Sequence, residues 1–129
     1  MKVGDYIRTN DGYIAKYLGC KTNSANQLFH YFDGTIRNIA SYVYEEDKFL
    51  WDDELKNIIK TSPNIIDLIE VGDYVNGERV FGFGKFEYDD GTEEITSLTL
   101  DKTISCLPKD IKSMLTKEQF ESMEYKVKE

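Results

Sequence analysis

The sequence contains two nearly identical pentapeptides, VGDYI at residues 3–7 and VGDYV at residues 71–75. Each copy is followed closely by Asn and Gly, in Asn10-Asp11-Gly12 and in Asn76-Gly77. These residue types readily adopt the positive φ angles of tight hairpin turns. The repeat therefore predicts two similar β-rich lobes in tandem, each opened by a strand and a hairpin.

Two further turns are predicted, at Asp33-Gly34 and at Asp90-Gly91, because each pair lies between apolar stretches rich in strand-forming residues. Gly82 and Gly84 alternate with phenylalanines and indicate a bent strand, since the helix start that a phosphate-binding glycine loop requires is missing. The segment 42–55 allows a strand followed by a helical turn beginning near Asp52, and is left open.

The segments 52–71 and 108–127 resemble each other and predict that each lobe ends in a short helix. In the first segment, Ser62 can cap a helix that has Pro63 at its first position. In the second, Thr116 and Gln119 have the spacing of a capping box. The apolar residues expected to pack the two lobes together are Ile65, Ile66, Leu68, Ile69, Phe120 and Met123.

These patterns predict a mainly β (α+β) protein of two tandem SH3-like barrels, each closed by a short helix. The first lobe is expected to span residues 1–70 and the second residues 71–129, with both lobes packed as one compact unit. A single continuous α+β sheet with two helices is the alternative.

The net charge is −8, from 24 acidic and 16 basic side chains, and the chain is rich in Tyr and Phe. A general binder of phosphate backbones needs an excess of Lys and Arg, so this composition argues against that class. Direct nucleic-acid binding stays open as the alternative function. It would use aromatic platforms and a basic groove formed from Tyr13, Tyr17, Phe81 and Phe83 with Arg8, Lys16, Lys21, Arg37, Arg79 and Lys85.

The sequence nominates no catalytic residue, cofactor or metal ligand, and we expect a protein without enzymatic activity. His30 is the single histidine and has no carboxylate or nucleophile near it in the sequence. Cys20 and Cys106 lie 86 positions apart without a metal-binding or secreted-scaffold pattern, which favours reduced thiols in a cytoplasm. No signal peptide or membrane-spanning run is recognisable.

Two acidic stretches with embedded aromatic residues are the candidate partner-binding segments. EEDKFLWDDE at 45–54 and EYDDGTEE at 87–94 each carry a net charge of −5. Aromatic side chains supply contact area at interfaces, and carboxylates attract a basic partner. The candidate binding residues are Glu45, Glu46, Asp47, Phe49, Trp51, Asp52, Asp53, Glu54, Glu87, Tyr88, Asp89, Asp90, Glu93 and Glu94. The alternative is that Phe49 and Trp51 enter the core.

The tandem GDY openings, the linker SPNIIDLIEVGDYVNG and the tail IKSMLTKEQFESMEYKV resemble small uncharacterised proteins of phages, prophages and mobile elements of low-GC Gram-positive bacteria. The matching segments are residues 2–17, 62–80 and 111–127. The resemblance implies a bacterial cytoplasm under phage infection, where small acidic proteins inhibit host nucleases, including as anti-CRISPR proteins. It supplies no binding or catalytic residue.

We therefore expect a phage or prophage inhibitor that binds a basic host defence protein, such as a CRISPR nuclease, and blocks its access to nucleic acid.

Overall fold

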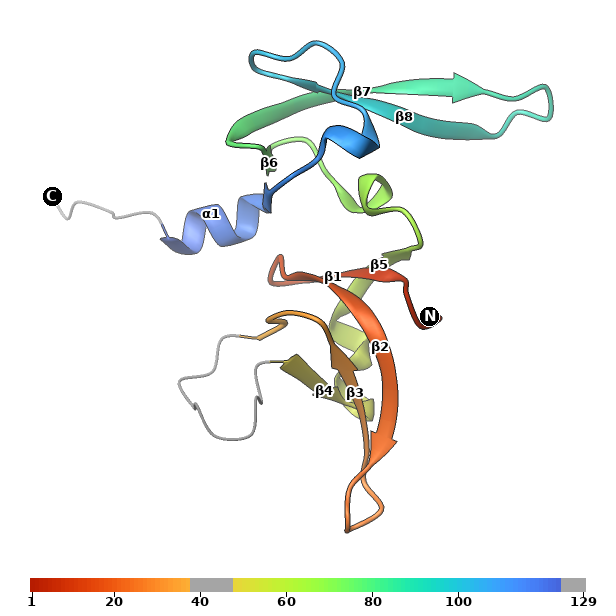
Figure 1. The fold of residues 1–129 in the computed structure, drawn as a ribbon, viewed down its shortest axis with the longest axis vertical. Coiled ribbons are helices and arrows are strands. Elements are labelled where there is room, and N and C mark those ends of the chain that lie inside the picture. The colour runs from red at the N-terminus through yellow and green to blue at the C-terminus, as the bar shows by residue number, and fades with distance from the viewer. Residues whose placement is uncertain (38–47, 124–129) are drawn as a thin grey trace, which may run out of the picture. The chain divides into compact units, whose positions relative to one another are not determined.

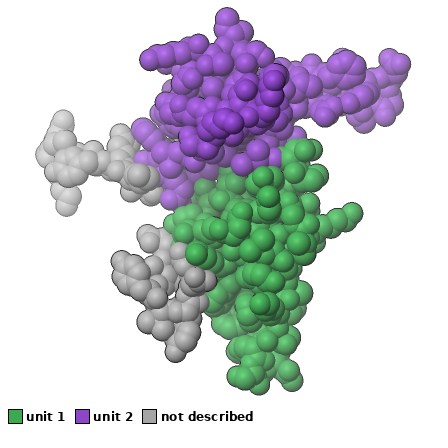
Figure 2. Space-filling model, in the orientation of Figure 1, with its two compact units in different colours: residues 1–64 green, residues 65–129 purple. Residues whose placement is uncertain are grey.

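A computed structural model of the chain describes residues 1–37 and 48–123 (Figure 1). The chain divides into two compact units, Met1–Asn64 and Ile65–Glu129 (Figure 2), which are described separately below. Both units consist mainly of antiparallel β-structure. The predicted lobe boundary after residue 70 falls inside the second of these units. The predicted interface residues Glu45, Glu46 and Asp47 lie outside the described residues.

The first unit contains a five-stranded antiparallel sheet with strand order β4-β3-β2-β1-β5 (Figure 1). Its strands are β1 (Tyr6–Thr9), β2 (Ile14–Thr22), β3 (Leu28–Phe32), β4 (Phe49–Trp51) and β5 (Ile58–Ser62). A 3-10 helix, η2 (Asp52–Asn57), connects β4 to β5. The segment left open by the sequence thus contains a short strand followed by a helical turn.

Alternation along the strands separates the core of the first unit from its outward face. In β3, His30 and Phe32 are buried, whereas Phe29 and Tyr31 point to the opposite side and are half-buried. The buried apolar cluster of this unit consists of Ile7, Ala15, Tyr17, Phe32, Ile36 and Leu50.

The second unit contains a four-stranded antiparallel sheet with strand order β8-β7-β6-β9. Its elements are η3 (Ile65–Leu68), β6 (Tyr74–Val75), β7 (Glu78–Glu87), β8 (Glu93–Leu100), η4 (Pro108–Asp110), β9 (Met114–Leu115) and the helix α1 (Lys117–Met123). An isolated bridge joins Leu98 to Cys106. The buried cluster consists of Ile66, Ile69, Val75, Val80, Leu98, Leu100 and Cys106.

The two units share one order of connections. In each, the first strand pairs with the second and also with the last, as β1 pairs with β2 and β5, and β6 pairs with β7 and β9. In each, a 3-10 helix precedes the last strand. The prediction of a mainly β fold is confirmed, whereas no closed barrel is found among residues 1–37 and 48–123.

The repeated pentapeptides occupy matching surroundings at the start of each unit. Gly4 has a φ of 95° and Gly72 a φ of 97°, a region that glycine enters without steric cost. The amide of Gly4 donates to the carbonyl of Tyr17 at 2.8 Å, and the amide of Gly72 donates to that of Val80 at 3.0 Å. The repeated pentapeptide therefore adopts the same local backbone conformation at the start of both units.

Three of the four predicted turns form hairpins and one does not. Asn10-Asp11-Gly12 connects β1 to β2. Asn76 and Gly77, with φ angles of 53° and 80°, connect β6 to β7, and Asp90-Gly91 lies between β7 and β8. By contrast, no described strand begins directly after Asp33-Gly34. Asp33 instead ends β3 by accepting a hydrogen bond from the amide of Lys16 at 2.7 Å, so its role is to fix the end of the sheet.

The glycines of the long hairpin β7–β8 have the structural role expected of them. The register of β7 against β8 shifts between Val80 and Gly82 and again between Gly84 and Lys85. Such irregularities bend a strand and tolerate residues without a side chain.

The helix predicted to close the first lobe corresponds to η3, which lies in the second compact unit. Ile66, in η3, and Ile69 are buried with strand residues of the second unit. The second closing helix is α1, where Thr116 Oγ1 accepts a hydrogen bond from the amide of Gln119 at 3.3 Å. In the described residues, no helix combines the length and apolar character needed to cross a membrane.

Candidate functional site

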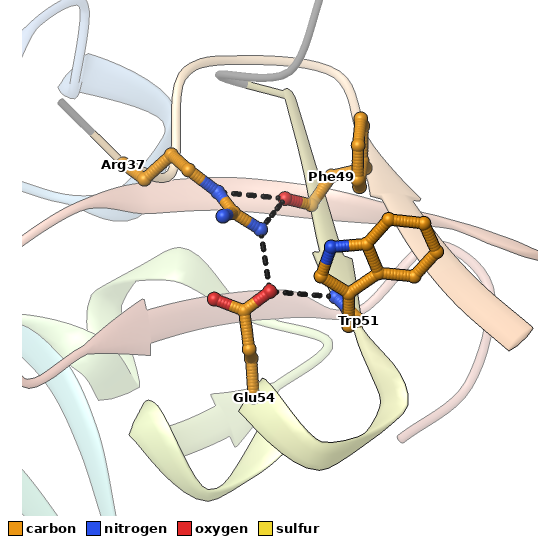
Figure 3. A network of polar contacts seen from close by, with 4 residues as sticks. All are labelled: Arg37, Phe49, Trp51 and Glu54. Carbon is orange, nitrogen blue, oxygen red and sulfur yellow. Dashed lines mark hydrogen bonds and ion pairs between the residues drawn. The ribbon is translucent and has the colours of Figure 1, made fainter. Parts of the chain in front are cut away.

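Glu54, in the first acidic stretch, stabilises the fold of the first unit. The Glu54 carboxylate accepts hydrogen bonds from the amide of Trp51 at 3.0 Å and from the Arg37 guanidinium at 2.7 Å (Figure 3). Arg37 also donates to the carbonyl of Phe49 at 2.6 Å. The Glu54 side chain is only 27% exposed. Glu54 therefore has a structural role in the first unit.

Phe49 and Trp51 lie outside the buried core of the first unit. They flank the buried Leu50 and point to the outward face of the sheet, where both contact Phe29. The ring centroids are 5.4 Å apart for Phe29 and Phe49, 6.1 Å for Phe29 and Trp51, and 5.3 Å for Phe49 and Trp51. The alternative that these two aromatic residues enter the core is thus wrong.

His30 has the partners that its sequence neighbourhood lacks. Its Nδ1 lies 2.8 Å from the hydroxyl of Tyr17, and its Nε2 lies 2.9 Å from Oδ1 of Asp52. The pKa of Tyr17 is raised, first by burial and then by the charge and hydrogen bond of the Cys20 side chain. Asp52 comes from η2, so only the pairing of β3 with β4 could have revealed this contact. The network joins β2, β3 and η2.

The second acidic stretch forms the end of the β7–β8 hairpin, which extends beyond the other elements of its unit (Figure 1). We call residues 86–94 the hairpin tip. All of its residues are exposed, including the aromatic side chains of Phe86 at 54% and Tyr88 at 46%. Its carboxylates are Glu87, Asp89, Asp90, Glu93 and Glu94.

Hydrogen bonds hold the hairpin tip in a defined conformation. Glu87 and Glu93 are cross-strand partners, and the amide of Tyr88 donates to the carbonyl of Thr92 at 2.8 Å. Asp90 Oδ1 accepts bonds from the amide of Thr92 at 3.0 Å and from its hydroxyl at 2.6 Å. These bonds from Thr92 lower the pKa of Asp90.

The two aromatic rings of the hairpin tip contact each other. Phe86 and Tyr88 have ring centroids 4.9 Å apart at an angle of 73°. The Tyr88 hydroxyl donates to Glu94 Oε2 at 2.5 Å, and this hydrogen bond raises the pKa of Tyr88. Lys85 lies 3.3 Å from Glu93. Phe86, which sequence reasoning missed, is thus a member of the site.

The structure brings together, at the hairpin tip, the predicted binding residues that lie within 87–94. Those of 49–54 belong to the other unit, where Asp53 is an exposed carboxylate and Asp52 binds His30. The hairpin tip is therefore the candidate functional site.

The residues expected to bind nucleic acid directly come from both units, and two of them are buried. Arg8 and Tyr17 are buried and cannot serve as surface contacts. The remaining basic residues are distributed over both units, with Lys21 above the ring of Tyr31 in the first and Arg79 above that of Phe81 in the second.

Comparison of the chain with protein-family models, curated proteins and solved structures finds no match.

Proposed function

We propose that this protein is a non-enzymatic inhibitor that binds a basic, nucleic-acid-binding partner protein through the hairpin tip. The observation that carries this proposal is the hairpin tip itself, where five carboxylates and two exposed aromatic rings share nine residues. The partner would be a host defence nuclease, and the hairpin tip would occupy the channel through which that nuclease takes up nucleic acid.

Electrostatics supports this assignment. A protein channel that binds nucleic acid is lined with Lys and Arg, which contact phosphate oxygens. Carboxylates at successive positions of a narrow hairpin offer the same cations a similar set of negative oxygens. Opposite charges also accelerate encounter between the proteins.

The aromatic rings supply contact area that charges alone do not. Exposed Phe and Tyr side chains become anchors when an interface buries them, and the pairing of Phe86 with Tyr88 limits the rotamer freedom lost on binding. We expect Phe86 to contribute the larger apolar surface, because the Tyr88 hydroxyl is engaged by Glu94.

The two units resemble each other in the order of their strand connections. We infer that the two units are tandem copies of one SH3-like unit, supported by their shared order of connections and by the matching surroundings of Gly4 and Gly72. The resemblance of the repeated segments to phage and prophage proteins supports a bacterial cytoplasm as the setting and a CRISPR nuclease as one candidate partner.

Affinity capture with paired charge reversals tests the site. The protein is used as bait in a nuclease-treated lysate of a low-GC Gram-positive bacterium, and captured proteins are identified by mass spectrometry. The double variant Glu87→Lys with Asp89→Lys is compared with the double variant Asp101→Lys with Glu121→Lys, which changes exposed acids outside the hairpin tip. Both variants change the net charge from −8 to −4. We expect a basic nucleic-acid-binding protein to be lost only with the first variant.

A second comparison separates aromatic contacts from charge. Phe86→Ala with Tyr88→Ala should weaken binding of the purified partner at least tenfold, as expected when interface anchors are truncated. Phe81→Ala is the matched control, since Phe81 lies on the same strand and is 55% exposed. Added nucleic acid should compete with the protein. Equal losses from both charge variants, or binding that nucleic acid does not affect, would remove the proposed mechanism.

A further inference from the structure

The first unit has a pocket on the outward face of β2, β3 and β4 that the proposed function does not use. Its volume is about 550 Å³, within the range of roughly 300–1,000 Å³ that is usual for small-molecule sites. Its lining includes Lys21, Phe29, Tyr31, Asp33, Lys48 and Phe49. All of them belong to this unit.

Strand register explains why aromatic rings gather at this pocket. Phe29 is paired with Trp51 and Tyr31 with Phe49, so that all four side chains lie on one face of the sheet. Each is only half-buried. The face therefore offers ring surfaces on rigid strands, held by edge contacts among Phe29, Phe49 and Trp51.

Cations border these rings although the whole chain is acidic. Lys21 Nζ lies 4.8 Å from the centroid of the Tyr31 ring, and the Arg37 guanidinium lies 5.4 Å from that of Phe49. Lys48 lines the same pocket. Asp33 is the acidic residue in the lining, and its Oδ1 is engaged by the amide of Lys16. The pocket thus combines apolar rings with two lysines, in contrast to the hairpin tip.

We propose that this pocket binds an unpaired nucleobase together with its phosphate. The base contacts the ring cluster of Phe29, Tyr31 and Phe49, stacking on the face of one ring because the planes of Phe29 and Phe49 are inclined by 59°. The phosphate pairs with Lys21 and Lys48. Aromatic rings on a sheet face bordered by Lys or Arg are the arrangement by which proteins bind single-stranded nucleic acid. The nucleotide comes either from a single strand or from a free mononucleotide, which present the same chemistry. This activity is independent of the hairpin tip.

Trp51 fluorescence provides a direct measurement. Trp51 is the single tryptophan of the chain and its ring is in contact with Phe29 and Phe49, so a base stacked on those rings alters its emission. The full chain is titrated at low salt with a twelve-residue thymidine oligonucleotide and, separately, with thymidine monophosphate. We expect saturable quenching by at least one ligand, with an affinity that decreases as salt increases.

Variants locate the site. Lys21→Glu, at an exposed position, and Tyr31→Ala should each weaken binding about tenfold or more, the size expected when one stacking or phosphate contact is removed. The control is Phe81→Ala, which removes the exposed ring below Arg79 in the second unit and should change affinity less than about twofold. Circular dichroism shows whether each variant is folded. If Tyr31→Ala does not fold, the binding measured for Lys21→Glu decides the result.

The outcomes are distinct. Binding of the oligonucleotide but not of the monophosphate identifies a single strand as the ligand, and equal binding per nucleotide identifies a mononucleotide. Absence of quenching by both ligands at 20 mM salt, about the lowest usable ionic strength, overturns the proposal. Binding that Lys21→Glu leaves unchanged overturns it as well. Loss of the hairpin-tip partner has no bearing on this result, because Phe86 and Tyr88 lie in the other unit.

Discussion

Asp5 and Asp73 close the same turn in the two units. Oδ2 of Asp5 accepts a hydrogen bond from the amide of Lys2 at 2.9 Å, and Oδ2 of Asp73 accepts one from the amide of Glu70 at 2.7 Å. The amides of the two aspartates donate back to the carbonyls of Lys2 and Glu70, at 2.9 and 3.1 Å. The Asp of each VGDY segment is therefore a structural residue that fixes the entry of the chain into the first strand.

The two aspartates should differ in their contribution to stability. Asp73 is fully buried and its Oδ1 also accepts a bond from the amide of Lys117, the first residue of α1. Asp73→Ala leaves two backbone donors without this acceptor and should lower the free energy of unfolding by about 3 kcal/mol. Asp5→Ala removes one partly exposed bond and should cost about 0.5–1 kcal/mol. Urea denaturation of both variants measures the difference, and equal losses would contradict it.

Glu54 should behave as a structural residue although it lies in an acidic, candidate-binding stretch. Glu54→Ala removes the acceptor for Trp51 and the ion pair with Arg37, and should lower the free energy of unfolding by about 2 kcal/mol. Asp53→Ala, at the exposed neighbouring position, should change it by less than about 0.5 kcal/mol. Glu54→Gln keeps the hydrogen-bonding oxygen and should fall between them in urea denaturation. A neutral Glu54→Ala would return this residue to the list of candidate partner contacts.

Tyr17 should make the stability of the protein sensitive to alkaline pH. Burial, followed by the charge and hydrogen bond of Cys20, raises its pKa above the ordinary value of 10.0. The folded state then holds the phenolic proton more tightly than the unfolded state. The resulting stabilisation is complete below about pH 10 and is lost as the pH rises through the folded-state pKa.

Tyr17→Phe keeps the ring contact with Phe32, at 5.6 Å between centroids, and removes the titrating group. The variant is expected to be less stable at pH 8, because His30 loses its bond to the hydroxyl, and to lose less stability than the wild type from pH 9 to about pH 11. Urea unfolding across this range compares them. Tyr88 and Lys117, whose pKa values are also raised, are present in both proteins and cancel. Parallel pH curves would show that Tyr17 does not contribute.

The turns and helix starts that depend on individual residue types were predictable from the sequence. The turn at Asn76-Gly77 requires positive φ angles, and the start of α1 requires an acceptor such as Thr116, so both follow from residue types alone. The acidic and aromatic hairpin tip was also recognisable, because its residues are consecutive in the sequence.

Contacts between distant segments were beyond such reasoning. Asp52 reaches His30 from 22 positions away, and Arg37 reaches Glu54 from 17, through pairings that the alternation of residues does not specify. The aromatic pocket depends on the register of β3 against β4, which sets Tyr31 opposite Phe49. A shift of one residue would have turned these rings into the core.

The boundary between the units yields a last prediction. The structure divides the chain after residue 64, whereas the sequence predicts a division after residue 70, so the six residues 65–70 are assigned differently. Ile66 and Ile69 lie in the buried cluster of the second unit, at 3% and 2% exposure. Glu70 forms an ion pair with Lys117 at 2.8 Å. A fragment of residues 65–129 should therefore fold alone and unfold cooperatively on heating.

A fragment of residues 71–129 should not fold. Removal of one buried Ile side chain costs about 2–5 kcal/mol, and a core of this size supplies no more than about 3–5 kcal/mol in total. Amide dispersion in NMR spectra and the cooperativity of thermal unfolding distinguish the two fragments. Ile66→Ala with Ile69→Ala in the longer fragment is the control that separates loss of side-chain packing from loss of chain length, and it should be as unfolded as the shorter fragment. A folded 71–129 fragment would instead assign residues 65–70 to the first unit and restore the boundary predicted by the sequence.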